Sequence, residues 1–224
     1  MTKRKKVPTT ENTTGIISII GINALEAIVP LVDALVAKPS AQPNEVQVLQ
    51  SENGLACAVV TISVLVLESA INRMRYIRRE ICDDDNVEYF AKIISDGELA
   101  KDIDEVVAIR DAVVHNHLWE ADVTWDDDLK LRFAAPPKLL DGFGNKRQRR
   151  VMEPKTRLSR RLGLNLFPVR IGRYEAFTAL RTIVKALAAI EAREQMYFPF
   201  SNQVFEHRRE MINLRNYFES LPAS

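Results

Sequence analysis

The chain has 224 residues, of which 46% are hydrophobic and 27% are charged. This length can bury one good hydrophobic core, and the composition is that of an ordinary globular protein. There are two cysteines, Cys57 within an apolar run and Cys82 after a basic one, and this usage excludes a disulfide framework. We therefore expect a reducing, cytoplasmic location.

The net charge of +1 conceals an asymmetry along the chain. Residues 146–224 hold 16 Lys/Arg and 7 Asp/Glu, whereas residues 1–145 hold 15 and 23. Two interpretations are equally open. The basic part can bind a polyanionic partner, or it can complement the acidic part within one chain or across a dimer.

The N-terminal segment Met1–Thr14 is polar and has four consecutive basic residues from Lys3, which predicts a disordered basic tail. Ile16–Ala37 follows as a predicted helix that Pro30 can kink. Acidic residues within it, and the lack of a small-residue cleavage pattern, disfavour a secretory signal. Lys38–Asn44 contains two prolines and is expected to be a linker inside a single domain of residues 15–224.

Asn53–Glu80 has the longest helical pattern. Its segment Leu55–Leu67 is almost entirely apolar, but glutamates bracket it and it is too short to cross a bilayer. We expect a fully buried core helix and no membrane partner. Glu68 and Asn72 lie one turn apart beside this run. They are either an exposed polar pair or a buried pair that faces a later helix.

The acidic run Asp83-Asp84-Asp85-Asn86 resembles metal-binding clusters in composition. A loop that caps the next helix, Val87–Ser95, is the better interpretation, because aspartate side chains accept hydrogen bonds from the first free N–H groups of a helix. Asp96-Gly97 then leads into the segment with the most promising chemistry.

That segment is Glu105–Trp119, which joins polar groups to an apolar helical period. It contains Arg110-Asp111-Ala112-Val113-Val114-His115, and two of the three histidines of the chain, His115 and His117. If the segment is one helix, Val106, Ile109 and Val113 form a buried stripe. The opposite face gathers Val107, Asp111, Val114, His115 and Leu118.

This second face mixes valines with polar groups and suits a subunit interface or a cleft. Arg110 and His115 project roughly 140° apart on an ideal helix. They can therefore act on one atom only if the arginine reaches around, the helix breaks, or a second copy faces the first. We take this as an indication of a homodimer.

After this helix the hydrophobic period changes to that of strands. Val123 and Trp125 alternate with polar residues, and Leu129, Leu131 and Phe133 do so after an acidic turn, which predicts a β-hairpin. The aspartates of that turn are expected to be solvated rather than to bind magnesium.

Gly142–Arg161 is predicted to be an irregular basic loop with a single acidic residue, Glu153. Repeated positive charge on a flexible segment suits contacts with RNA phosphates, although a solubilising or dimer-bridging loop is nearly as well supported. The arginines assigned to RNA binding are Arg147, Arg149, Arg150, Arg157, Arg160 and Arg161.

The C-terminal part is expected to be mostly helical. Leu164–Ile171 alternates weakly and suggests a third strand. Tyr174–Tyr197 and Val204–Leu221 are predicted amphipathic helices, separated at Pro199. The expected fold class is mainly α, with a small β-hairpin insertion before the last long helix.

The hexapeptide from Arg110 to His115 resembles the Arg–polar–x3–His signature of the HEPN superfamily, whose members are helical bundles. The order of the neighbouring elements agrees: a long apolar helix ending in Leu67–Asn72 precedes the motif, and a hairpin and a closing long helix follow it. The resemblance covers about Asn53–Tyr197 and implies a HEPN-like helical bundle.

The resemblance implies a metal-independent endoribonuclease without a cofactor, acting as a dimer in which two motif copies meet at one cleft. His115 would serve as general base toward an RNA 2′-hydroxyl or as acid toward the leaving 5′-oxygen. Arg110 would stabilise charge on the phosphate, and Asp111 would orient either residue. Glu68 and Asn72 would line the same cleft. The products would carry 2′,3′-cyclic phosphate and 5′-hydroxyl ends. A toxin, a phage-defence effector and a housekeeping enzyme are roles that the sequence leaves open.

One position departs from the pattern. HEPN toxins controlled by a partner nucleotidyltransferase carry a tyrosine two residues after the motif histidine, and His117 stands there instead. The identity of any antitoxin or trigger is therefore open. Two alternatives stand beside the ribonuclease. A non-catalytic HEPN-like nucleotide-binding, RNA-binding or scaffold module would hold Arg110 and His115 in local contacts. A metal site of Asp111, His115 and His117 is weaker, since His117 points elsewhere on the helix.

Overall fold

The computed structural model describes residues 20–40, 45, 52–115, 119–128, 130–140, 146–193 and 200–221. The predicted tail Met1–Thr14 lies outside these residues. The described helices are α1 (Ile20–Val36), α2 (Asn53–Arg78), α3 (Asn86–Ile94), α4 (Gly97–Val114), α5 (Lys146–Val151), α6 (Arg173–Arg193) and α7 (Leu214–Glu219). The strands are β1 (Trp119–Glu120), β2 (Val123–Trp125), β3 (Leu131–Phe133), β4 (Lys138–Leu139), β5 (Val204–His207) and β6 (Glu210–Asn213). The prediction of a mainly α fold is confirmed.

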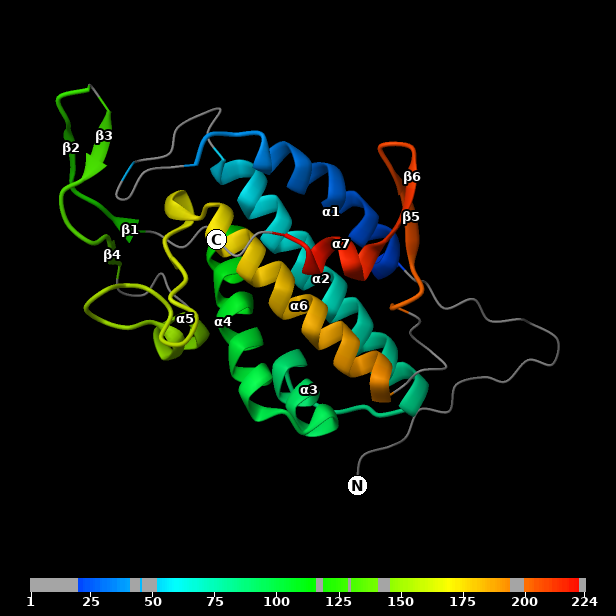
Figure 1. Cartoon of the computed structure of the whole chain (residues 1–224). Helices are drawn as coiled ribbons and strands as arrows, with labels where there is room; N and C mark the ends of the chain where they lie inside the picture. The colour runs from blue at the N-terminus through cyan, green and yellow to red at the C-terminus, as the bar shows by residue number, and fades with distance from the viewer. Residues whose placement is uncertain are drawn as a thin grey trace, which may run out of the picture.

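Helix α2 is the centre of the bundle and packs against α1, α4 and α6 (Figure 1). Val59, Val60 and Ile71 on α2 are buried in the common core. The expectation that the helix is fully buried is wrong, because Leu65 and Tyr76 are 51% and 63% exposed. By length and composition α2 could cross a membrane, but half of its most apolar 18-residue window is buried within the bundle.

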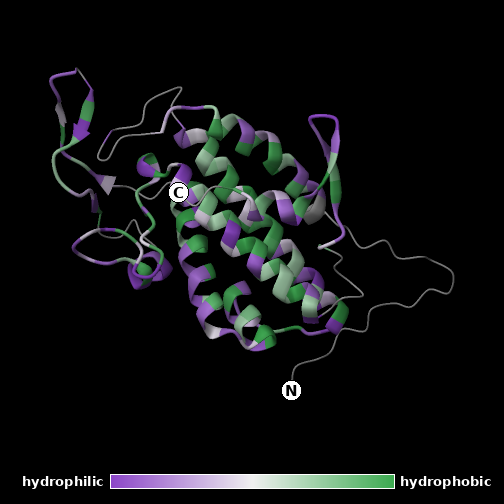
Figure 2. Cartoon of the chain, in the orientation of Figure 1, coloured by the Kyte–Doolittle hydropathy of each residue, from purple (hydrophilic) through white to green (hydrophobic). Residues whose placement is uncertain are grey.

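Helices α1 and α6 cover α2 because each carries a continuous apolar stripe. Figure 2 shows the hydrophobic residues concentrated along these helices. On α6, Phe177, Leu180 and Leu187 are fully buried. Helix α1 contains Pro30, as predicted, and its described part begins at Ile20.

The predicted hairpin before the last long helix is confirmed. Strands β2 and β3 pair antiparallel, with Val123 opposite Phe133 and Trp125 opposite Leu131, and they stand at one edge of the bundle (Figure 1). Asp126 shapes the turn, because its carboxylate accepts hydrogen bonds from the N–H of Lys130 at 2.8 Å and from Arg132 Nε at 2.7 Å. The hydrogen bond from Arg132 lowers the pKa of Asp126. A second antiparallel pair joins β1 to β4.

The prediction of a helix over Val204–Leu221 is wrong. This segment forms the β5–β6 hairpin, in which His207 pairs with Glu210, and then the short helix α7. Arg208 and Arg209 at the turn have φ of 53° and 71°. Two left-handed residues give the mirror-image turn whose twist matches that of a hairpin.

The third strand suggested for Leu164–Ile171 is also wrong. The backbone makes an isolated bridge between Leu158 and Asn165 and then a 3-10 turn over Pro168–Arg170. Glu175, a buried residue of α6, accepts the backbone N–H groups of Asn165 at 3.1 Å and Gly172 at 2.9 Å. These N–H groups are therefore bound by a side chain rather than by a neighbouring strand.

A polar cluster joins the two ends of the described chain. His207 Nε2 lies 2.7 Å from Asp33 Oδ2 on α1, and the Tyr217 hydroxyl donates to Asp33 Oδ1 at 3.2 Å. Burial raises the pKa of Asp33, but the hydrogen bond and charge of His207 outweigh it, so the net shift is downward. The cluster ties β5 and α7 to α1.

Candidate functional site

Helix α4 carries the Arg110–His115 motif. It begins after Asp96, whose carboxylate accepts the N–H of Leu99 at 3.0 Å. It ends at Val114, so the predicted helix Glu105–Trp119 is too long: Trp119 belongs to β1. His115 is the C-cap, with φ −90° and ψ 3°, and its N–H bonds the Asp111 carbonyl at 3.0 Å.

Arg110 reaches across to the central helix. Its Nη2 lies 2.5 Å from Glu68 Oε1 on α2, and its Nε lies 3.2 Å from Asp111 Oδ1. The side chains of Arg110 and Glu68 are 20% and 24% exposed, so this ion pair is largely shielded from water. Of the two interpretations of Glu68, the one in which it faces the Arg110 helix agrees with this geometry.

Asp111 connects the motif to the basic segment. Arg147 on α5 places Nη1 3.3 Å from Asp111 Oδ2, Nε 2.9 Å from Asp104 and Nη2 2.7 Å from Asp85. Burial lowers the pKa of Arg147, yet the three carboxylates hold it above its ordinary value. Charges of alternating sign therefore run from Arg147 through Asp111 and Arg110 to Glu68.

His115 has a different environment from Arg110. It lies at the exposed end of α4, next to Val114, which is 51% exposed. His117 and Leu118 fall outside the described residues. Among the residues that are described, no group of three or more His, Cys, Asp or Glu could hold a metal ion. The expected second face of α4 is only partly exposed, because Val107 is 4% exposed and belongs to the core.

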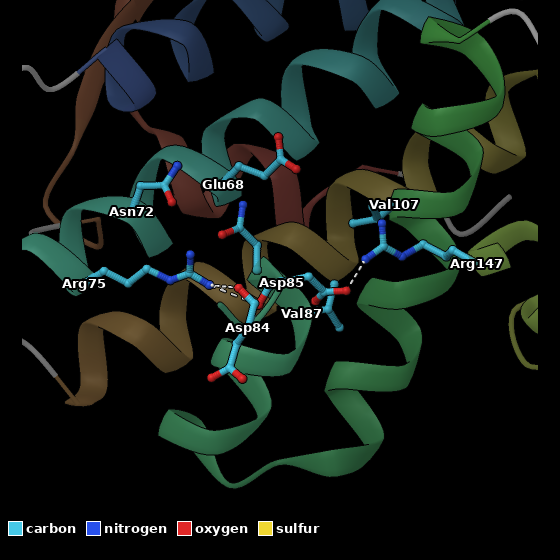
Figure 3. A pocket seen from close by; sticks show the side chains of 9 residues that line it. Glu68, Asn72, Arg75, Asp84, Asp85, Val87, Val107 and Arg147 are labelled. Carbon is cyan, nitrogen blue, oxygen red and sulfur yellow. Dashed lines mark hydrogen bonds and ion pairs between the residues drawn. The ribbon is translucent and has the colours of Figure 1, made fainter. Parts of the chain in front are cut away.

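A cleft of about 380 Å³ lies beside the Arg110–Glu68 pair. Its walls come from α2, from the loop and first turn of α3, from α4 and from α5 (Figure 3). Glu68 and Asn72 both line it, whereas Arg110, Asp111 and His115 are not among its lining residues, so a cleft shared with the motif stays a prediction. The remaining lining residues are Arg75, Asp84, Asp85, Asn86, Val87, Val107 and Arg147.

The acidic run before α3 caps that helix, as predicted. The Asp85 carboxylate accepts the Glu88 N–H at 2.9 Å, and the Glu88 carboxylate accepts the Asp85 N–H at 3.2 Å, which is a capping box. Asp84 pairs with Lys92 at 2.6 Å, and the hydrogen bond from Lys92 lowers the pKa of Asp84. The loop wall of the cleft is therefore fixed at several points.

The arginines assigned to RNA binding lie largely against acidic residues of the same chain. Arg147 and Arg150 share Asp104, the latter at 2.8 Å. Arg161 bonds Asp102 and Glu98 at 2.8 Å each, and Arg160 bonds Glu153 at 3.4 Å. Arg149 is exposed and Arg157 is half-buried. The charge asymmetry thus includes complementarity within one chain, which was one of the two interpretations.

Sequence reasoning missed Glu105, a buried carboxylate on α4 that is 2% exposed. It accepts hydrogen bonds from Ser159 Oγ at 2.6 Å and from the N–H groups of Arg161 and Leu162 at 2.8 Å each. These bonds fasten the basic segment to α4, and part of that segment is the helix α5 rather than an irregular loop. The apolar neighbours of Glu105 in sequence were the one available signal.

Comparisons with protein-family models, with curated proteins and with solved structures found no match to this chain. The interpretation of the site therefore depends on its own residues and geometry. These comprise a shielded arginine, an exposed histidine on the same helix, and a cleft beside the ion pair of that arginine with Glu68.

Proposed function

We propose that the chain is a metal-independent endoribonuclease of HEPN type, built on a HEPN-like helical bundle. The observation that carries the proposal is the pairing of Arg110 with Glu68 at 2.5 Å, at the edge of a cleft that Glu68 and Asn72 line. A shielded carboxylate fixes the arginine fork in one orientation, so that charge stabilisation of a phosphate needs little rearrangement. His115 stands exposed on the same helix.

The proposed reaction needs one proton acceptor and one fixed positive charge. His115 takes the proton of an RNA 2′-hydroxyl, the 2′-oxygen attacks the adjacent phosphorus, and the bond to the 5′-oxygen breaks. The 5′-oxygen leaves with a proton taken from water, the proton held by His115 returns to water, and a 2′,3′-cyclic phosphate forms. Arg110 stabilises the charge that accumulates on the phosphate oxygens, and Asp111 holds Arg110 through its carboxylate at 3.2 Å.

The proposed active form is a homodimer. Arg110 points toward α2, whereas His115 is exposed at the end of α4, and an ideal helix separates their directions by roughly 140°. Two motif copies facing each other would supply an arginine and a histidine to one phosphate. Val114, which is exposed beside His115, is the residue we assign to that contact. We further propose a cytoplasmic toxin or phage-defence role, with an antitoxin or trigger still to be identified.

A second candidate is a non-catalytic module that binds nucleotides or RNA, or that acts as a dimeric scaffold. The observation that favours it is the involvement of Arg110 with both Glu68 and Asp111, since an arginine held by two carboxylates can be purely structural. The exposure of His115 favours the ribonuclease instead, because a structural module would be expected to bury it.

The test is cleavage of single-stranded RNA by the purified protein in EDTA. Wild type is expected to cut, and His115→Ala and Arg110→Ala to lose at least a hundred-fold in rate, a typical contribution of general base or charge stabilisation. Lys185→Ala removes an exposed positive charge on α6 and serves as control. Arg110→Lys keeps the positive charge that pairs with Glu68 but lacks the planar guanidinium. A loss of cleavage rate in this variant therefore points to catalysis rather than to misfolding. Equal activity in all variants would contradict the proposal.

A further inference from the structure

The cleft beside Arg110 has a floor and a rim of different character. Val87 and Val107 at its base are 8% and 4% exposed, and the surrounding side chains are polar. An apolar floor with a few convergent polar groups is the usual form of a small-ligand site, and about 380 Å³ is within the size range of such sites. A flat aromatic ring could lie on the two valines.

The cations of the cleft are already engaged in contacts within the chain. Arg147 pairs with Asp85, Asp104 and Asp111. Arg75 donates from Nη2 to the carbonyls of Asp84 and Asp85 at 2.8 and 3.0 Å, and its guanidinium lies over the Tyr89 ring at 4.6 Å. A phosphate would have to break these contacts, so the cleft is poorly suited to an anion.

Two amides remain available. Asn72 on α2 and Asn86 at the start of α3 both line the cleft, and among the described residues the structure gives neither side chain a hydrogen-bond partner. Each amide offers a donor and an acceptor side by side, the arrangement that reads the edge of a base. Figure 3 shows Asn72 and Glu68 side by side on α2.

The other rim groups are acceptors. Glu68 gives one carboxylate oxygen to Arg110, which leaves it with a second oxygen, whereas Asp84 is hydrogen-bonded to both Lys92 and Cys82. Carboxylates accept hydrogen bonds from exocyclic amino groups of bases. Adenine, cytosine and guanine carry such a group. Uracil offers a single N–H group between two carbonyl oxygens, so a carboxylate that accepts from it is also repelled by the neighbouring oxygens.

We propose that this cleft is a base-recognition pocket that selects a base with an exocyclic amino group over uracil. The inference rests on the proposed function in placing that base next to the scissile phosphate, because Glu68 belongs both to the pocket and to the Arg110 pair. The base must be unstacked to enter, so the substrate is single-stranded RNA. The capping box and the three bonds of Arg147 hold the pocket in place before binding.

Free nucleosides test the pocket without a phosphate that could bind elsewhere. NMR titration of the full chain with adenosine is expected to shift the side-chain amide signals of Asn72 and Asn86, with a Kd about ten-fold below that for uridine. Glu68→Gln should bring the Kd of adenosine close to that of uridine, because the selection depends on this carboxylate. Asn72→Ala should weaken the binding of both nucleosides, whereas Asn202→Ala, at an exposed asparagine before β5, should change nothing. Glu68→Gln keeps an amide oxygen for Arg110, and Asn72 has no side-chain hydrogen-bond partner among the described residues, so neither substitution removes a hydrogen bond of the fold.

Equal binding of the two nucleosides, no shift with adenosine up to its solubility, or unchanged selectivity in Glu68→Gln would overturn the inference. Its failure is distinguishable from failure of the ribonuclease. Selective adenosine binding by a protein that never cuts RNA would support the base-recognition pocket and contradict the ribonuclease activity. Cleavage that is lost in His115→Ala but proceeds at the same rate at every base would support the ribonuclease activity and contradict the base-recognition pocket.

Discussion

The buried carboxylate of Glu105 is predicted to be a principal link between α4 and the segment that follows α5. Replacing it with alanine leaves the Ser159 hydroxyl and the N–H groups of Arg161 and Leu162 without their acceptor. An unsatisfied buried donor costs on the order of 1–3 kcal/mol, and water reaches part of this loop. We expect Glu105→Ala to lower the free energy of unfolding by about 3–5 kcal/mol, a large share of the total for a domain.

Glu105→Gln retains one oxygen but turns an NH₂ group toward a donor, so we expect about half that loss. Urea unfolding followed by circular dichroism measures the free energy of unfolding of both variants. In thermal unfolding, Glu105→Ala should lower Tm by about 10 °C. Glu98→Ala is the matched control, because Glu98 lies on the same helix but is 67% exposed. Surface ion pairs of this kind contribute little. A stability of Glu105→Ala equal to that of the control would refute the reasoning.

Two further predictions concern the interface and the joined ends of the chain. Val114→Asp should give a monomer by light scattering and lose activity, since it puts charge on an exposed valine of the proposed contact; a variant that stays dimeric would sink this assignment. The pKa of Asp33 is lowered below its ordinary value of 3.8. The Asp33 carboxylate therefore adds to the free energy of unfolding above pH 3.8, and this stabilisation is lost as the pH falls through the lowered pKa. Asp33→Asn should therefore reduce the loss of unfolding free energy that occurs below about pH 4. Denaturant unfolding at pH 3 and pH 7 measures this loss in both proteins. The same loss in wild type and variant would count against a stabilising role for the Asp33 cluster.

The helices of the bundle could be predicted from the sequence because their signals are local. Each helix can be recognised within a few turns of sequence. The signals are the apolar run of Asn53–Arg78, the capping residue Asp85 and the apolar stripe of α6. The β2–β3 hairpin likewise has strict alternation on both sides of an acidic turn. These elements were expected at nearly the places where they occur.

The last hairpin could not be predicted in this way. Its turn uses Arg208 and Arg209 in the left-handed region, where glycine or asparagine is the usual signal. Its strands are too short to separate their period from that of a helix. The pairing of β5 with α1 through Asp33 and His207 is tertiary, and nothing near His207 in sequence indicates it.

The candidate site could be predicted in its residues but not in its contacts. The motif identified Arg110, and the polar pair on α2 identified Glu68, but no local pattern joins two residues that lie 42 positions apart. The position of Arg147 among three carboxylates was also hidden, because a run of arginines has the same composition whether it binds RNA or its own chain. The exposure of His115 could not be predicted, because it depends on α4 ending at Val114, and the sequence pattern placed that end later.

The most direct test of the account is the requirement for the attacking hydroxyl. Wild-type protein is incubated in EDTA with an RNA that it cuts and with the same RNA carrying a single 2′-deoxynucleotide at the cleavage position. We expect the first RNA to be cut to 2′,3′-cyclic phosphate and 5′-hydroxyl ends and the second to stay intact at that position. Cleavage of the deoxy-substituted site, or ends bearing a 5′-phosphate, would contradict attack by the 2′-hydroxyl and with it the role assigned to His115.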